Sequence, residues 1–240
     1  MHAFNSNRLR WLGIAAFAAA ATPVAAQVLL SPNAFEIGVS GVTFQNGGFI
    51  PDGNPGGWAD TRLIQTPENK SIISVVVSLV IDGGYNGDFY AYLRAPGGQI
   101  SILLNRVGST SENSFGSSDA GLNITLRDNA PTDVHLYDST TFNLDTSGRL
   151  TGAWQPDGRP ATSLVTDTSP RTAPLSTFSG TQPDGNWTLF IADLSTGEVG
   201  AIKSWGIQMT VVPEPRDWTL ASAAALILFS ACRSNRRPSV

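Results

Sequence analysis

The stretch IKSWGIQMTV, residues 202–211, has the plainest structural pattern in the chain. Its apolar side chains, Trp205, Ile207, Met209 and Val211, alternate with polar or small residues. Successive side chains of a β-strand point to opposite faces, so this alternation is typical of a strand with one apolar face. We expect residues 202–211 to form a half-buried strand.

The preceding segments show related patterns. Trp187, Leu189 and Ile191 share one face of a second expected strand, and the loop Asp193–Gly200 is expected to close a hairpin between these two strands. The segment Ile72–Ile81 is apolar apart from interspersed serines, which is typical of a central strand.

A further hairpin is expected from Phe89–Leu93 and Gln99–Leu104, because Ala95-Pro96-Gly97-Gly98 between them has turn-forming residues. No segment holds a helical apolar period for long, and Gly and Pro recur at short intervals. The pattern predicts an all-β class with a sandwich architecture. Tryptophans in such a fold usually pack in the core, although Trp154 is also a candidate sugar-stacking platform.

The amino-terminal residues have the pattern of an export signal. Arg8 and Arg10 precede an apolar run, and small residues at Val24-Ala25-Ala26 favour cleavage between Ala26 and Gln27. We expect residues 1–26 to be a signal peptide and the mature chain to lie outside the cytoplasm, in the cell envelope, at the cell surface or in the medium. The only cysteine is Cys232, so the exported module 27–212 has no disulfide.

The carboxyl terminus combines three parts. These are the sequence Val212-Pro213-Glu214-Pro215, the apolar run Trp218–Cys232, and the basic residues Arg233, Arg236 and Arg237. The run would span roughly 22 Å as a helix at about 1.5 Å per residue, which is short for the ~30 Å core of a bilayer. An ordinary membrane anchor is therefore the less favoured alternative to a processed sorting tail.

This terminus resembles the PEP-CTERM sorting signal of bacterial surface proteins, with its motif at 213–215, its apolar segment at 218–232 and its basic tail at 233–240. The resemblance implies a short transmembrane helix, inserted transiently or permanently, and a membrane enzyme of the exosortase type that processes the chain near the motif.

The exported module is acidic. Residues 27–212 contain nine Lys and Arg against seventeen Asp and Glu, a formal charge of minus eight. Nucleic acid requires a positive surface, so this balance argues against a nucleic-acid partner.

Several segments of the module share an order with a known family. They are IPDG (50–53), the strand 75–81 followed by YNGDF (85–89), LRAPGG (93–98), PLSTFSG (174–180), DGNWTL (184–189), Asp193 and SWGI (204–207). In this order they resemble the P domain, or P/Homo B domain, of subtilisin-like proprotein convertases, over roughly 41–211. The resemblance implies a jelly-roll β-sandwich, and in convertases this domain follows a protease domain and stabilises it.

No catalytic residue is expected. A Ser-His-Asp triad would have to use His135, the one histidine of the exported module, and its surroundings, DVHL, lack a subtilisin-like context. Calcium is the one metal to consider: Asp82, Asp88 and Asp119 fall at or beside expected strand ends and offer oxygen ligands, although turn acids in solvent are the simpler interpretation. No cofactor is required by the sequence.

Two function classes follow. The first is a non-catalytic surface or extracellular-matrix protein whose sandwich binds a polysaccharide or a surface protein after processing. The second is a P domain associated with proteolysis, which stabilises or docks on a separately encoded subtilisin-like serine protease. We favour the first.

Overall fold

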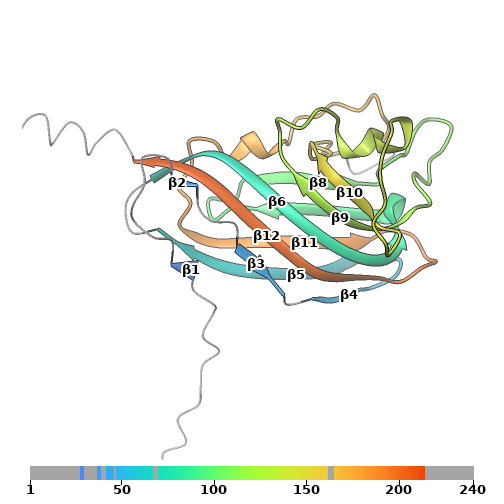
Figure 1. The fold of residues 1–240 in the computed structure, drawn as a ribbon, viewed down its shortest axis with the longest axis horizontal. Helices are drawn as coiled ribbons and strands as arrows, with labels where there is room; N and C mark the ends of the chain where they lie inside the picture. Colours follow the sequence, from blue (N-terminus) through green and yellow to red (C-terminus); the bar gives the residue numbers. More distant parts are fainter. Residues whose placement is uncertain are drawn as a thin grey trace, which may run out of the picture.

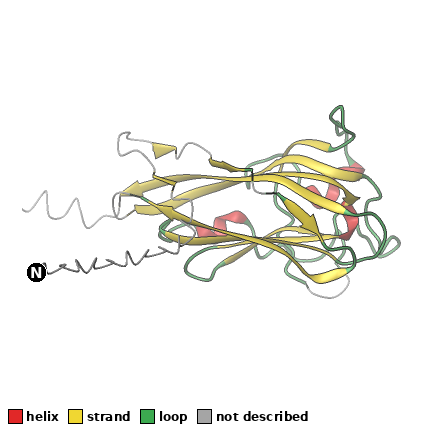
Figure 2. Cartoon of the chain, turned by 90° about the horizontal axis from the view of Figure 1, so that it is seen from below, coloured by secondary structure: helices red, strands yellow, loops and turns green. Residues whose placement is uncertain are grey.

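The computed structural model describes residues 28–29, 37–38, 42–45, 47–66, 70–161 and 165–213. In these ranges the chain forms two β-sheets that lie face to face, with the irregular segments mostly at one end (Figure 1, Figure 2). The all-β class and the sandwich expected from the sequence are confirmed.

The first sheet has the strand order β1-β5-β11-β7-β8. Its pairs are antiparallel except β1 with β5, which is parallel. The strands are β1 Val28–Leu29, β5 Asn54–Gln65, β7 Phe89–Arg94, β8 Ile100–Asn105 and β11 Gly185–Asp193. The expected hairpin is confirmed as β7 and β8, whose turn is closed by the Gly98 amide donating to the carbonyl of Ala95 (2.9 Å).

The second sheet has the order β10-β9-β6-β12-β2, and two short strands, β3 and β4, also pair with β12. Its strands are β2 Ile37–Gly38, β3 Val42–Phe44, β4 Gly48–Ile50, β6 Lys70–Tyr85, β9 Ala120–Leu126, β10 Leu150–Trp154 and β12 Gly200–Pro213. The central position expected for residues 72–81 is confirmed, because β6 lies between β9 and β12.

One expected connection is wrong. The strands β11 and β12 do not form a hairpin: β11 pairs with β5 and β7 in the first sheet, whereas β12 pairs with β6 in the second. The loop between them crosses from one sheet to the other. An alternating pattern shows which face of a strand is apolar, but it does not show which strand becomes its neighbour.

The core lies between the two sheets and contains the apolar faces predicted from the sequence. Trp205, Ile207 and Met209 of β12 are buried, as are Trp187 and Leu189 of β11. The Trp205 indole also joins the sheets, since its Nε1 donates to Asp60 Oδ2 on β5 (2.8 Å). This bond satisfies the one polar atom of a buried tryptophan.

Helical structure in the described part of the chain is limited to three 3₁₀ turns: η1 Asn86–Asp88, η2 Val134–Ser139 and η3 Leu175–Phe178. None of the helices found there has the length and hydropathy needed to cross a bilayer. The proposed signal peptide 1–26, Ala26 and Gln27 at its cleavage site, and the proposed sorting residues from Glu214 onward lie outside the described residues.

Candidate functional site

A pocket of about 350 Å³ opens where four segments meet at one end of the sandwich. We call it the end pocket; its lining residues are Tyr85, Asp88, Phe115, Gly116, Ser117, Ser118, Ser195 and Thr196. They come from the end of β6, from η1, from the loop before β9 and from the loop between β11 and β12. Its size is at the lower end of the range of pockets that bind small ligands.

Backbone hydrogen bonds hold these segments together. The Gly87 amide donates to the Ser117 carbonyl (2.9 Å), and the Leu194 amide donates to the Asp88 carbonyl (2.9 Å). Gly87 permits the close approach, because a β-carbon there would lie 2.3 Å from the carbonyl oxygen of Phe115. The turn η1 is therefore the element that joins both neighbouring loops.

Asp88 is the charged residue of the end pocket, and it is only 6% exposed. Burial raises the pKa of its carboxyl group, while a hydrogen bond from Ser195 and the charge of Arg106 act in the opposite direction. None of the ion pairs between described residues includes Asp88. Asp88 is therefore a desolvated carboxylate that lines the pocket and has no ion pair with a basic side chain of the described residues.

Two more acids add negative charge beside it. Asp193, at the end of β11, is fully buried; its Oδ1 accepts from the Ser195 amide (3.1 Å), and its Oδ2 has no hydrogen-bond partner in the described structure. Burial raises the pKa of Asp193, and the charges of Asp88 and Asp52 raise it further. Asp52 accepts from the Gly197 amide (2.9 Å), so the acidic residues approach from three different segments.

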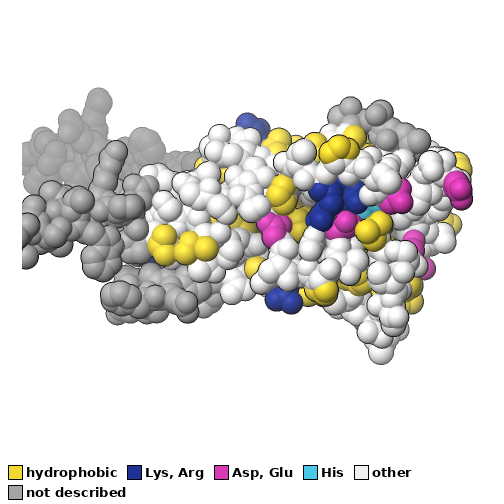
Figure 3. Space-filling model, turned by 90° about the horizontal axis from the view of Figure 1, so that it is seen from above, with side chains coloured by type: hydrophobic (Ala, Val, Ile, Leu, Met, Phe, Trp, Pro, Cys, Tyr) yellow, Lys and Arg dark blue, Asp and Glu magenta, His cyan; other side chains and the backbone are white. Residues whose placement is uncertain are grey.

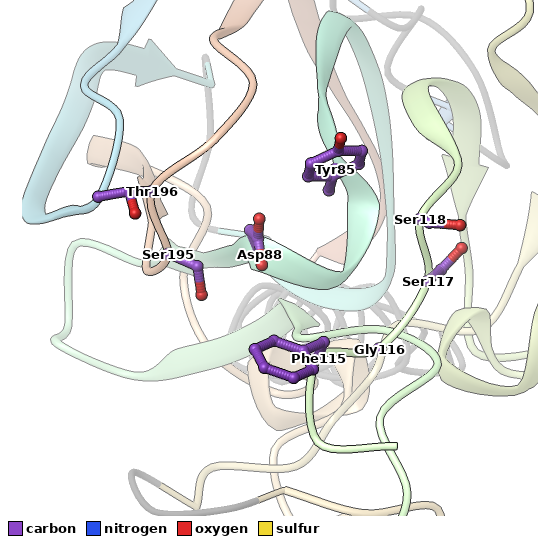
Figure 4. A pocket seen from close by; sticks show the side chains of 8 residues that line it. All are labelled: Tyr85, Asp88, Phe115, Gly116, Ser117, Ser118, Ser195 and Thr196. Atoms are coloured by element: carbon purple, nitrogen blue, oxygen red, sulfur yellow. The ribbon is translucent and has the colours of Figure 1, made fainter.

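Aromatic rings form the walls of the end pocket. Figure 4 shows the rings of Tyr85 and Phe115 on either side of Asp88, with Ser195 and Thr196 on one flank and Ser117 and Ser118 on the other. Phe115 is 74% exposed, so its ring is accessible to a ligand in the pocket. Rings, hydroxyl groups and one carboxylate together are suited to binding a ligand.

A second group of charged residues lies inside the fold. This ionic cluster consists of Asp133, His135, Asp157, Arg159 and Arg171. Arg159 contacts Asp133 and Asp157 at 3.3 Å each, and Arg171 reaches Asp133 at 3.5 Å from a partly exposed position. Figure 3 shows basic side chains of the described part gathered beside acidic ones and a histidine on one face.

His135 is not arranged as a catalytic base. Its side chain is fully buried, its Nδ1 lies 2.7 Å from Asp157 Oδ2, and its Nε2 lies 2.8 Å from the Ser109 carbonyl oxygen. In a triad Nε2 would accept a hydrogen bond from a serine hydroxyl. Here Nε2 faces a backbone carbonyl, which can only accept a hydrogen bond. The Ser109 hydroxyl donates elsewhere, to the Val165 carbonyl (2.7 Å).

The three acids predicted as calcium ligands have different surroundings. Asp82 pairs with Arg149 (2.7 Å) and with Lys203 (3.3 Å), Asp88 lines the end pocket, and Asp119 accepts from the Tyr137 hydroxyl (3.2 Å). Across the described ranges, no group of three or more His, Cys, Asp or Glu residues is positioned to hold a metal ion. The sequence did not indicate Asp52 and Asp193 as neighbours of Asp88.

Two other predicted positions can be placed. Trp154 is 7% exposed and its Nε1 donates to the Thr151 carbonyl (3.0 Å), so it packs in the core and is not a sugar platform. Val212 and Pro213, the first residues of the proposed sorting sequence, belong to β12, where they lie opposite Ser71 and Lys70. The other residues of that sequence, Glu214, Pro215, Arg233, Arg236 and Arg237, lie outside the described residues.

The family model described as "proprotein convertase P-domain" matches residues 72–209, more than half of the chain. The chain belongs to the proprotein convertase P-domain family. The match begins at β6 and ends within β12, and both sheets are represented in it. The P-domain resemblance expected from the sequence is thereby confirmed for these residues.

Two solved structures are similar to this P domain. They are a serine protease of Aeromonas sobria in complex with its chaperone ORF2 and a serine protease of Aeromonas sobria alone; each is 16% identical, has a TM-score of 0.41 and covers 75% of this chain. The chain spans about a quarter of the length of those proteins, 27% and 28%. No curated protein matches this sequence.

The family motif includes parts of the end pocket. The lining residues Tyr85 and Asp88 belong to the YNGDF segment, and Asp193, an acidic neighbour of Asp88 outside the lining, follows the DGNWTL segment. These residues carry the resemblance to the family, but nothing in the sequence predicted that they lie together. No sequence pattern indicated that Phe115, Ser117 and Ser195 would line a site, because isolated loop residues have no periodic pattern.

Proposed function

We propose that this P domain is a non-catalytic module that docks on a separately encoded subtilisin-like serine protease and stabilises its fold. Membership of the P-domain family over residues 72–209 carries the proposal, since in convertases the domain accompanies a protease and stabilises it. The burial of His135, with both ring nitrogens facing acceptors, also favours a module without its own hydrolytic site. This was the alternative in the sequence analysis, and the family match supports it better than the matrix protein.

Docking predicts a measurable change in the protease. Adding the purified chain to a subtilisin-like protease without its own P domain is expected to raise the melting temperature of the protease. At one hundred times the Kd, binding stabilises a partner by about 2.7 kcal/mol, which corresponds to roughly 5–10 °C at about 2–4 °C per kcal/mol. Differential scanning calorimetry of the protease with and without the chain measures this shift.

A chymotrypsin-type protease serves as the control, and its melting temperature is expected to stay constant. The docking function would be refuted if the melting temperature of the subtilisin-like protease did not change and the chain were retained on an extracellular polysaccharide. That result would favour the surface or matrix protein instead.

We propose further that the chain is exported and sorted through its two termini. The order of Pro213-Glu214-Pro215, the apolar run 218–232 and the terminal arginines supports processing by an exosortase-type enzyme. Replacing Glu214 with alanine, or deleting 233–240, is expected to leave a longer form in the membrane fraction. Immunoblots of fractionated cells reveal it, with the exposed Glu112→Ala as the matched control; normal maturation of both altered tails would contradict the proposal.

A further inference from the structure

We propose that the end pocket binds an arginine side chain displayed on the surface of a partner protein. The inference rests on the proposed function only in naming the protease as the source of that arginine. The pocket itself is defined by Asp88, the rings of Tyr85 and Phe115, and the surrounding hydroxyl groups.

Asp88 carries a charge that has no ion-pair partner among the described residues. A buried carboxylate is costly unless it is paired with a cation or well hydrogen-bonded. Asp88 has a hydrogen bond from Ser195 but no ion pair within the described part, and it faces a pocket that is open to a ligand. A positively charged ligand with N–H donors would remove this cost.

The charge around the end pocket is mainly negative. Besides burial, the charge of Asp52 raises the pKa of Asp88, and the charges of Asp88 and Asp52 raise the pKa of Asp193. Arg106 is the positive charge that lowers the pKa of Asp88. Arg106 is directed to another acceptor, because its Nη2 donates to the Ser114 carbonyl (3.2 Å). With three carboxyl groups and one guanidinium group, the net charge around the pocket is negative, which favours a cation over a neutral ligand.

The shape and lining of the end pocket suit a guanidinium group better than an ammonium group. A guanidinium group is planar, stacks on aromatic faces and donates several hydrogen bonds in one plane, whereas an ammonium group is a compact point charge. The rings of Tyr85 and Phe115 lie on either side of Asp88, and the hydroxyls of Ser195 and Thr196 lie on one flank (Figure 4). Rings, carboxylate and hydroxyls therefore correspond to the stacking faces and the acceptors that arginine uses.

A sugar also stacks on aromatic rings and binds hydroxyl groups, so it is the competing ligand. It carries no positive charge and would leave the charge of Asp88 unpaired. A charge-matched pair of probes separates these ligands.

The test is titration of the purified chain with N-acetyl-arginine amide and with N-acetyl-citrulline amide, followed by ¹H–¹⁵N NMR. Citrulline has nearly the same shape but replaces the guanidinium with a neutral urea. We expect the arginine probe to shift the amide signals of Ser117, Ser118 and Thr196, and to bind at least about tenfold more tightly than citrulline, as for a charged hydrogen bond.

Asp88→Asn is expected to remove this preference for arginine, because it keeps the shape and deletes the charge. Its melting temperature should not fall, since an amide avoids burying an unpaired carboxylate. Phe115→Ala should weaken the binding of the arginine probe without abolishing the preference for arginine over citrulline. Asp167→Asn, an exposed acid outside the lining of the end pocket, is the matched control and should bind like the original chain.

Equal binding of both probes, no binding of the arginine probe, or shifts of the same amides by glucose in its place would each overturn the inference. The two proposals fail separately. Arginine binding without any stabilisation of the protease would refute docking and leave the pocket assignment intact. Protease stabilisation that is unchanged in Asp88→Asn would refute the role of the pocket and leave docking intact.

Discussion

Replacing Arg159 with methionine is expected to lower the free energy of unfolding by about 3–5 kcal/mol, as when one partner of a buried ion pair is removed. The Arg159 side chain is 2% exposed and contacts Asp133 and Asp157. It also donates to the carbonyl of Asp167 (2.9 Å). Methionine fills a similar volume but removes the donors that Arg159 supplies. Asp133 then keeps only the longer contact with the partly exposed Arg171, and Asp157 keeps its hydrogen bond with His135.

Urea unfolding followed by tryptophan fluorescence measures this loss. Arg94→Met is the matched control, because Arg94 is exposed at the end of β7 and enters no ion pair between described residues. Its change should stay within about 0.5 kcal/mol, as for ordinary surface substitutions. A loss below about 1 kcal/mol for Arg159→Met, the size typical of exposed ion pairs, would mean that the cluster is solvated.

Trp205→Ala is expected to cost about 3–5 kcal/mol of stability, since it removes a large aromatic side chain from a close-packed core. Trp205 is fully buried on β12, and its ring lies 4.7 Å from that of Phe44. Its Nε1 donates to Asp60 on the opposite sheet, so the same substitution also breaks a bond between the two layers.

Trp205→Phe separates these two contributions. It retains most of the packing and removes the donor to a charged acceptor, which is expected to cost about 1.5–3 kcal/mol. Phe115→Ala, at an exposed aromatic position, serves as the control and should be nearly neutral for stability. If Trp205→Phe were as costly as Trp205→Ala in urea unfolding, packing would not be the main contribution of this side chain.

The strands around Trp205 and Trp187 were predictable because alternation is a local property of the chain. A strand with one face in the core must place an apolar residue at every second position, and 202–211 and 187–191 do so. Residues 72–81 are apolar on both faces, and β6 is accordingly the central strand between β9 and β12. The turn at Pro96 and Gly98 was predictable for the same reason, since its chemistry is contained in four consecutive residues.

The choice of neighbouring strand in each sheet was less predictable. The loop after Asp193 is short enough for a hairpin, yet it leads to the other sheet. The strand β10 runs parallel to β9, a pairing that no local pattern indicated. Part of the long connection 145–174 is held inside the fold by the buried pair of Arg159 and Asp157, which no local pattern indicated.

The end pocket shows the same division. Asp88 was identified as a candidate ligand from its place beside a strand end, and its family motif was recognised. Its neighbours were not, because Phe115 lies 27 positions and Ser195 lies 107 positions further along the chain. These residues meet through backbone hydrogen bonds of η1, and such bonds carry no signature of side-chain type.

The amino-acid order alone was sufficient for the all-β class, the apolar faces of the main strands and the P-domain family, since each depends on residues that are close in the chain or on a motif with fixed spacing. The two-sheet pairing, the burial of His135 with Asp157, and the meeting of Asp52, Asp88 and Asp193 were decided only by the folded chain. All three share one physical reason, because each is a contact between segments that are distant in the chain. The packing that stabilises such a contact, and the desolvation that its polar groups undergo, exist only after the sheets have closed on each other.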